Sequence, residues 1–127
     1  MTLRCVIVDD SPDVLRAASE LLGGQGIAVV GVAATGDEAV SLMEELQPDV
    51  MLVDIVLGSE SGFDLVRRVV QSVDTAACRT ILISTHDGAD FANLIAGSPA
   101  IGFLAKSDLS ATAIRRLLAG AHDEGGD

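Results

Sequence analysis

Short apolar runs alternate with segments of helical period along the whole chain, and this alternation constrains the fold more than any other feature. We predict strands at the apolar runs: Leu3 to Val8, Ile27 to Ala33, Val50 to Ile55, Thr80 to Ser84 and Ile101 to Ala105. The predicted helices run from Pro12 to Leu22, Thr35 to Leu46, about Phe63 to Val73, Ala89 to Ala96 and Ser110 to Ala119. A strand followed by a helix, repeated in this way, is typical of an α/β domain with a doubly wound, five-stranded parallel sheet and helices on both faces.

Residues at the helix ends support these boundaries. Ser11 and Pro12 supply an N-cap and a first-turn proline for the first helix, and the glycine pair at 23–24 is expected to end it. Thr35, with Glu38 three residues later, forms the capping-box pattern that opens the second helix.

The chain of 127 residues is long enough for one domain. We expect the domain at 1–121 and a flexible acidic tail at 122–127. No apolar run approaches the roughly 20 residues that span a bilayer. Met1 leads into a strand-like segment and not into a signal peptide, which predicts a cytoplasmic protein.

The charge of the chain excludes some partners. Eight basic and 19 acidic residues give a net charge of −11, which repels nucleic acid phosphates and anionic lipids. We therefore expect no direct nucleic acid binding by this domain and no membrane association. Cys5 and Cys78 lack ligand-like spacing, and we expect neither a disulfide nor a metal role for them.

Polar side chains follow four of the five predicted strands. The pair Asp9-Asp10 ends the first strand, Asp54 lies near the end of the third, Ser84-Thr85 ends the fourth, and Lys106 follows the fifth. Ligands of open α/β sheets bind beyond the carboxyl ends of the strands. This edge of the sheet is therefore the predicted site.

Three carboxylates at one place repel one another unless a cation lies among them. Carboxylate and carbonyl oxygens suit a hard ion such as Mg²⁺, whereas zinc prefers His or Cys. A carboxylate can also attack phosphorus to give an acyl phosphate, a reaction that depends on positioning and on counter-charges around the phosphoryl oxygens. Mg²⁺, the Lys106 ammonium and the Ser84 hydroxyl would supply one counter-group each.

Four segments together give the chain a family resemblance over nearly its whole length. They are V-I-V-D-D at 6–10, L-V-D-I-V-L-G-S-E-S-G at 52–62, I-L-I-S-T at 81–85 and G-F-L-A-K at 102–106. In this order and at these strand ends, they resemble the receiver domain of two-component response regulators. The resemblance implies a flavodoxin-like strand order, 2-1-3-4-5.

The resemblance also implies a role for each site residue. Asp54 would be the phosphoacceptor. A Mg²⁺ ion would be held by Asp9, Asp10, Asp54 and the main-chain carbonyl of Val56, with Asp9 acting directly or through water.

The remaining implied roles concern activation. Lys106 would pair with the phosphoryl oxygens, and Ser84 would be the switch hydroxyl that phosphate draws inward. Phe103 would be the switch aromatic that fills the space which Ser84 vacates. The output face would be the fourth helix, the fifth strand and the fifth helix.

The chain departs from the family pattern at two positions. Ser107 follows Lys106 where the family commonly has a proline, often after a cis bond. A cis bond before a non-proline residue costs about 3 kcal/mol, so this bond is either trans or strained. Gly58 stands where the family often has proline, which is expected to loosen the loop after Asp54.

Alternative interpretations stay open for several residues. Thr85 is an alternative to Ser84 as the switch hydroxyl, and Phe103 has an ordinary core role as its alternative. His86 has two readings, a loop histidine in solvent or a group that tunes hydrolysis of the acyl phosphate. The pair at 115–116 is explained by the helix dipole or by an interface.

The leading hypothesis is a signalling switch that takes a phosphoryl group from a sensor histidine kinase or a phosphotransfer protein. It is an enzyme only in catalysing its own phosphorylation and dephosphorylation, and it is a candidate for homodimerisation on phosphorylation. A flavodoxin-type electron carrier would need a phosphate cradle and stacking aromatics, and a hydrolase would need a cap insertion. The other alternative is the receiver half of a DNA-binding regulator with a helix-turn-helix domain.

Overall fold

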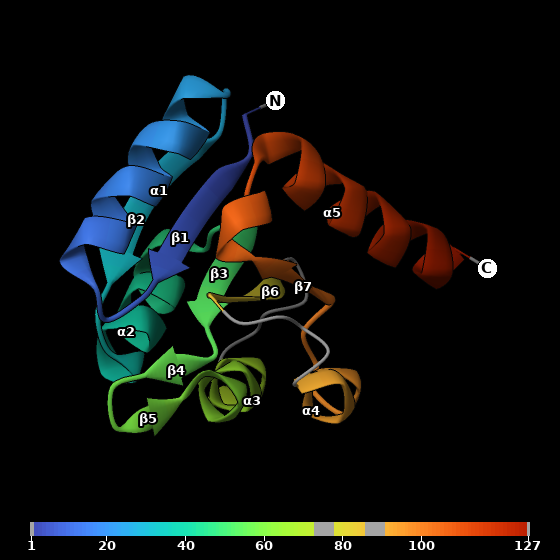
Figure 1. The fold of residues 1–127 in the computed structure, drawn as a ribbon. Coiled ribbons are helices and arrows are strands. Elements are labelled where there is room, and N and C mark those ends of the chain that lie inside the picture. Colours follow the sequence, from blue (N-terminus) through green and yellow to red (C-terminus); the bar gives the residue numbers. More distant parts are fainter. Residues whose placement is uncertain (1, 73–77, 86–90, 127) are drawn as a thin grey trace.

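A five-stranded parallel sheet forms the centre of the computed structural model, which describes residues 2–72, 78–85 and 91–126 (Figure 1). The sheet has the order β2-β1-β3-β6-β7. Its strands are β1 (Arg4–Val8), β2 (Ala28–Ala33), β3 (Val50–Asp54), β6 (Arg79–Ser84) and β7 (Gly102–Ala105). Counted along the chain, this order is 2-1-3-4-5, so the predicted flavodoxin-like topology is confirmed.

Helices connect these strands as the alternating pattern predicts. They are α1 (Pro12–Gly24), α2 (Gly36–Leu46), α3 (Gly62–Ser72), α4 (Ala92–Ala96) and α5 (Ala111–Gly126), with a 3₁₀ turn, η2, at Lys106–Asp108. The crossovers between parallel strands leave the carboxyl ends of all five strands at one edge of the sheet.

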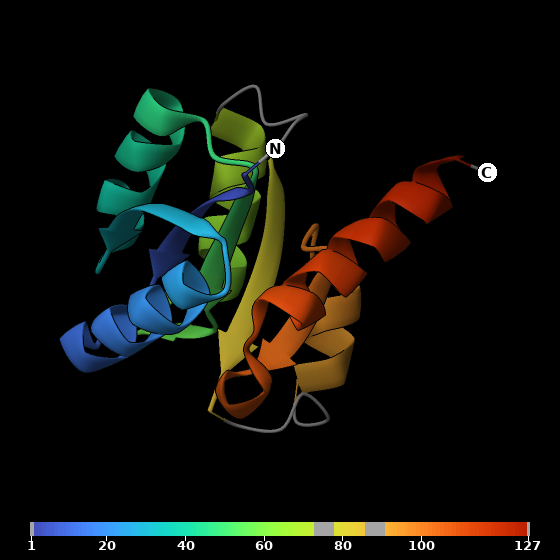
Figure 2. The same ribbon diagram turned by 90° about the horizontal axis from the view of Figure 1, so that it is seen from above.

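The core lies in two layers, because successive residues of a strand point to opposite faces of a sheet. On β1, Val6 and Val8 pack with buried residues of α2 and α3, whereas Cys5 and Ile7 pack with buried residues of α1 and α5. Figure 2 shows the two pairs of helices on opposite sides of the sheet. Helices on both faces are therefore confirmed.

Side-chain caps begin two of the helices as expected. The Ser11 hydroxyl accepts a hydrogen bond from the Val14 N–H at 3.4 Å, and Pro12 is the first residue of α1. The Thr35 hydroxyl accepts from the Glu38 N–H at 3.2 Å at the start of α2. Both starts are thus fixed by local sequence. The end of α1 was predicted too early, because the helix includes both glycines at 23–24.

The largest differences from the predicted elements are in the second half of the chain. The helix predicted from Ala89 is α4, which begins at Ala92 after Phe91. Residues 86–90 lie outside the described residues, as does Val73 of the helix before it. Helix α5 continues past Ala119 to Gly126, and its C-terminal part extends away from the sheet (Figure 1). The division of the chain at residue 121 stays a prediction. In the described residues, no helix has both the length and the apolar character needed to cross a membrane.

A short hairpin that we did not predict follows β3. Its strands, β4 (Val56–Leu57) and β5 (Glu60–Ser61), are antiparallel. Gly58 lies in the turn with φ +58°, a conformation that proline, fixed near −65°, does not adopt. Gly58 thus provides a turn conformation that proline could not, and the expectation that it loosens the loop stays a prediction. Gly-Ser between two short strands is a known hairpin signal, and the segment V-L-G-S-E-S contains it.

Candidate functional site

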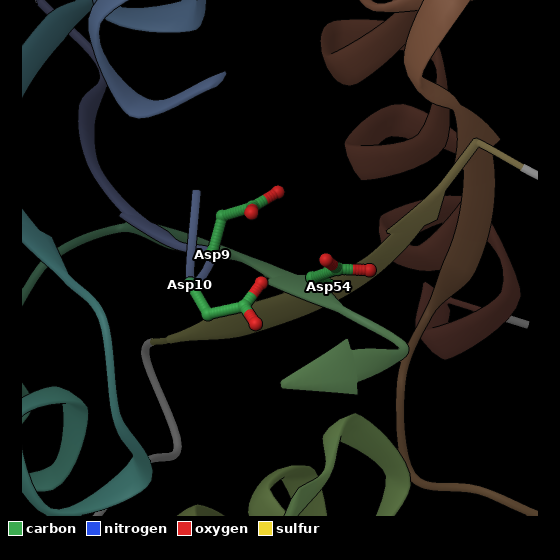
Figure 3. Close-up of side chains that lie close together, drawn as sticks. All are labelled: Asp9, Asp10 and Asp54. Carbon is green, nitrogen blue, oxygen red and sulfur yellow. The ribbon is translucent and has the colours of Figure 1, made fainter. Parts of the chain in front are cut away.

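Three aspartates meet at the carboxyl edge of the sheet (Figure 3). Asp9 and Asp10 directly follow β1, and Asp54 ends the neighbouring strand β3. Each offers a carboxylate oxygen, and these oxygens lie within 4.8 Å of one another. Asp9 and Asp54 are buried, with 0% and 7% of their surface exposed, whereas Asp10 is exposed. The predicted convergence of the three carboxylates is present.

Lys106 brings the one cation that contacts these aspartates in the described chain. Its Nζ lies 2.6 Å from Asp9 Oδ2 and 3.2 Å from Asp54 Oδ2. The residue begins the 3₁₀ turn η2 directly after β7, and its side chain is 17% exposed. Its ammonium group is therefore directed at two carboxylates, one directly after β1 and one at the end of β3.

The other oxygen of each buried carboxylate is held by nearby backbone. Asp9 Oδ1 accepts a hydrogen bond from the Ser11 N–H at 2.9 Å, and Asp54 Oδ1 accepts one from the Val56 N–H at 3.2 Å. Both bonds reach two residues along the chain, as in Asx turns. One oxygen of each carboxylate is thus fixed locally, while the other faces Lys106.

The site carries more negative than positive charge. Three carboxylates and one ammonium give a formal charge of 1 − 3 = −2. Burial raises the pKa of Asp54, the Val56 hydrogen bond lowers it, and the charge of Asp9 raises it again, for a net rise. Burial alone lowers the pKa of Lys106, but its contacts with Asp9 and Asp54 outweigh this and leave the pKa raised.

The donor set fits a hard divalent cation. Asp9 Oδ2 is buried and, among the described residues, accepts no hydrogen bond, although it lies in ion-pair contact with Lys106. The Lys106 ammonium, 2.6 Å away, offsets part of the cost of burying this oxygen, but three carboxylates around one ammonium leave surplus negative charge. A cation bound by the carboxylate oxygens would offset that charge.

Ser84 and Phe103 lie on neighbouring strands beside the aspartates. Ser84 ends β6 and is 2% exposed, whereas Thr85 is exposed. Phe103 on β7 pairs in register with Leu82, which is two residues before Ser84 and therefore on the same face. Phe103 is partly buried against the core cluster on that face. The two residues thus lie on the same face of adjacent strands, two positions apart in register, and their switch roles stay predictions.

Two further predictions concern the loops around the site. Val56 is exposed and lies in β4, where its N–H binds Asp54; the role of its carbonyl stays a prediction. The bond between Lys106 and Ser107 is trans, since the described chain contains no cis peptide bond. The trans alternative is thus the one observed. His86 lies outside the described residues.

The chain is similar to known proteins along most of its length. Residues 5–118 match the family model described as the response regulator receiver domain. The chain is similar to protein-glutamate methylesterase/protein-glutamine glutaminase 1 of Vibrio vulnificus (strain YJ016), with 34% identity over 107 residues, 84% of this chain and 28% of that protein. It is 34% identical to Protein PilH of Pseudomonas aeruginosa over 84 residues, 66% of this chain and 69% of PilH. The chain therefore spans little more than a quarter of the methylesterase relative.

Solved structures of response regulators are also similar to this chain. The crystal structure of a two-component response regulator of the LuxR family from Aurantimonas sp. SI85-9A1 superposes with a TM-score of 0.83 at 33% identity, covering 94% of this chain and 87% of that one. The signal receiver domain of the putative response regulator NarL from Mycobacterium tuberculosis has a TM-score of 0.80 at 27% identity, covering 95% and 97%.

Proposed function

This chain belongs to the response regulator receiver domain family of two-component signalling, and from that premise we propose that it is a switch controlled by phosphorylation of Asp54. The phosphoryl group would come from a sensor histidine kinase or a phosphotransfer protein. We further propose that the switch works in the cytoplasm and that phosphorylation changes partner binding or promotes homodimerisation.

The observation that carries this proposal is the arrangement of the Asp54 carboxylate. One oxygen is fixed by the Val56 N–H, and the other lies 3.2 Å from the Lys106 ammonium. A nucleophile needs a fixed direction, and the transferring phosphoryl group needs positive charge near its oxygens. Both requirements are met by residues of this chain.

In the proposed reaction, an Asp54 oxygen attacks the phosphorus of a phosphohistidine. The P–N bond breaks, its electron pair returns to the imidazole nitrogen, and that nitrogen takes up a proton. Attack of water on the phosphorus later breaks the acyl phosphate, which releases phosphate and restores the Asp54 carboxylate. The chain is thus an enzyme only toward its own phosphoryl group.

The residues around Asp54 would each serve this reaction. Asp9, Asp10, Asp54 and the main-chain carbonyl of Val56 would hold Mg²⁺, which when bound supplies positive charge against the phosphoryl oxygens. The Lys106 ammonium, which contacts Asp9 and Asp54 now, would pair with a phosphoryl oxygen.

The switch would lie beside the phosphorylation site. The Ser84 hydroxyl would donate to the phosphoryl group, and Phe103 would move into the space that Ser84 leaves. The output face would then be α4, β7, which contains Phe103, and α5. A change confined to these elements would alter the surface presented to a partner.

Intact mass after incubation with acetyl phosphate and Mg²⁺ tests the proposal. The wild type should gain about 80 Da, the mass of one phosphoryl group, and only when Mg²⁺ is present. Asp54→Asn should gain nothing. An equal gain in the Asp54→Asn variant would overturn the assignment, as would no gain in a wild type that still binds Mg²⁺.

A second candidate function is the receiver part of a longer DNA-binding regulator. The similarity to the two-component response regulator of the LuxR family favours it. The two chains are 33% identical, and the match covers 87% of the solved chain. The phosphorylation chemistry would be the same, but the output would be a tethered domain. The mass of the protein in cells of the source organism separates the candidates, because a tethered regulator is substantially heavier than 13.0 kDa.

A further inference from the structure

The hairpin β4–β5 links the phosphorylation site to the start of two helices. It leaves β3 immediately after Asp54, and its first residue, Val56, donates its N–H to the Asp54 side chain. At its other end, the Ser61 hydroxyl accepts from the Phe63 N–H at the start of α3. The position of the hairpin therefore decides where one of the two Asp54 oxygens is held.

A hairpin with two residues per strand is too small to be stable alone. Its base is fixed by close packing of backbone. The Gly62 N–H donates to the Ile55 carbonyl at 2.7 Å, and a Cβ on Gly62 would lie 2.1 Å from the Asp54 carbonyl oxygen. Only glycine allows this approach. Backbone packing at Gly62 therefore fixes the base of the hairpin but does not reach its tip.

At the tip, Leu57 is buried in the core, and the polar contacts with the helices are made by the side chain of Glu60. Its Oε2 accepts a hydrogen bond at 3.1 Å from the N–H of Gly36, the first residue of α2. Its Oε1 lies 3.4 Å from the Arg68 guanidinium of α3, which also contacts Asp37. The start of a helix favours a carboxylate, because its first N–H groups lack partners within the helix.

Gly36 leaves the space that this contact requires. A Cβ at this position would lie 2.1 Å from Glu60 Oε1 and 2.7 Å from Oε2. Alanine is otherwise the better helix former, so glycine here costs helix stability. The pairing of a glycine at 36 with a carboxylate 24 residues later is therefore a matched contact between the hairpin and α2.

We propose that Glu60 is a positioning residue for the phosphorylation site, because its contact with the start of α2, together with the buried Leu57, holds the hairpin that fixes Asp54. It touches neither Asp54 nor the other two aspartates in any contact described above. The inference deepens the proposed function and rests on it for its kinetic part, while its structural part concerns the hairpin alone.

The first measurement is amide hydrogen exchange by NMR without Mg²⁺. In Glu60→Ala, the Val56 and Gly36 amides should exchange about tenfold faster than in the wild type, the effect of losing one hydrogen bond to a charged group. Glu60→Gln keeps an oxygen acceptor and should stay within about threefold of the wild type.

Gly36→Ala should break the same contact in another way. Its methyl group would displace the flexible carboxylate end of Glu60, while the Glu60 side chain itself is kept. It should accelerate Val56 exchange as Glu60→Ala does, and the double variant should be no faster than either single variant. Gly24→Ala is the matched control, since a methyl there meets no atom within 4 Å. It should exchange like the wild type.

The second measurement is the rate of phosphorylation by acetyl phosphate at saturating Mg²⁺. Glu60→Ala and Gly36→Ala should be about tenfold slower, with midpoints of thermal unfolding close to that of the wild type, and Glu60→Gln should be largely restored. Wild-type exchange at Val56 in both variants would overturn the inference. If the wild type itself takes no phosphoryl group, the proposed function fails, and the exchange data still decide whether Glu60 holds the hairpin.

Discussion

Aspartates occur at both edges of the central sheet, but the groups that surround their carboxylates differ between the two edges. At the amino edge, Asp49 precedes β3, and its Oδ2 accepts the Arg4 N–H at 2.8 Å. The Arg4 guanidinium in turn donates to the Leu46 and Gln47 carbonyls at the end of α2, at 2.7 and 3.1 Å. Asp49 and Arg4 thus each have hydrogen-bond partners, as a structural contact requires.

At the carboxyl edge, Asp9 and Asp54 also have backbone partners, but three carboxylates lie around one ammonium group. Lys106 is shared between Asp9 and Asp54, one oxygen of Asp9 accepts no hydrogen bond from the described residues, and Asp10 adds a further negative charge. The comparison teaches that a carboxylate by itself is no sign of function. The sign is a group of carboxylates whose charge the fold leaves unbalanced.

The largest expected difference between the two edges is in Mg²⁺ affinity. Asp9→Asn removes a buried negative ligand and should weaken Mg²⁺ binding by at least about tenfold, whereas Asp49→Asn at the amino edge should not change it. Isothermal titration calorimetry measures both. Equal losses in the two variants would mean that the edges do not differ in the way described.

Replacing an aspartate by alanine should change the stability in opposite directions at the two edges. In a buffer with a chelator, Asp10→Ala relieves repulsion and should raise the free energy of unfolding. Asp49→Ala loses the bond to the Arg4 N–H and should lower it by about 1 kcal/mol. Urea denaturation followed by circular dichroism gives both values. The comparison breaks if Asp10→Ala is the more destabilising variant.

A smaller effect should appear in the pH dependence of stability. The pKa of Asp54 is raised above its ordinary value of 3.8, mainly by burial, so the folded protein binds this proton more tightly than the unfolded chain. Its contribution to stability is complete below pH 3.8 and is lost as the pH rises through the folded pKa. In a chelator, the advantage of Asp54→Asn over the wild type should therefore grow from pH 3.8 upward. A pH-independent difference in denaturation experiments would contradict this.

The smallest effect is expected at the two cysteines, Cys5 in β1 and the partly buried Cys78 just before β6. Burial, foremost, raises the pKa of Cys5 to about 12 and that of Cys78 to about 11. At pH 8 the folded protein should therefore show little alkylation by iodoacetamide, while the urea-unfolded chain reacts at both thiols. Mass spectrometry counts the adducts. Rapid labelling of Cys5 in the folded state would show that the core opens.

Most of the fold could be predicted because its signals are local. Apolar runs of strand length and the caps at Ser11 and Thr35 act over a few residues, and the structure confirms them. The hairpin β4–β5 was missed although its Gly-Ser turn is a local signal, because strands of two residues leave no periodicity to detect. The predicted ends of two helices were wrong, because α1 and α5 both continue beyond them.

The sequence by itself determined which edge of the sheet carries the site. Parallel strands joined by helices place all their carboxyl ends together, so Asp9, Asp54 and Lys106 had to converge. Only the tertiary structure decided which oxygen faces Lys106 and that Glu60 meets Gly36. Those contacts depend on how α2 and α3 pack against the sheet, and packing of elements distant in the chain leaves no periodic trace in the sequence.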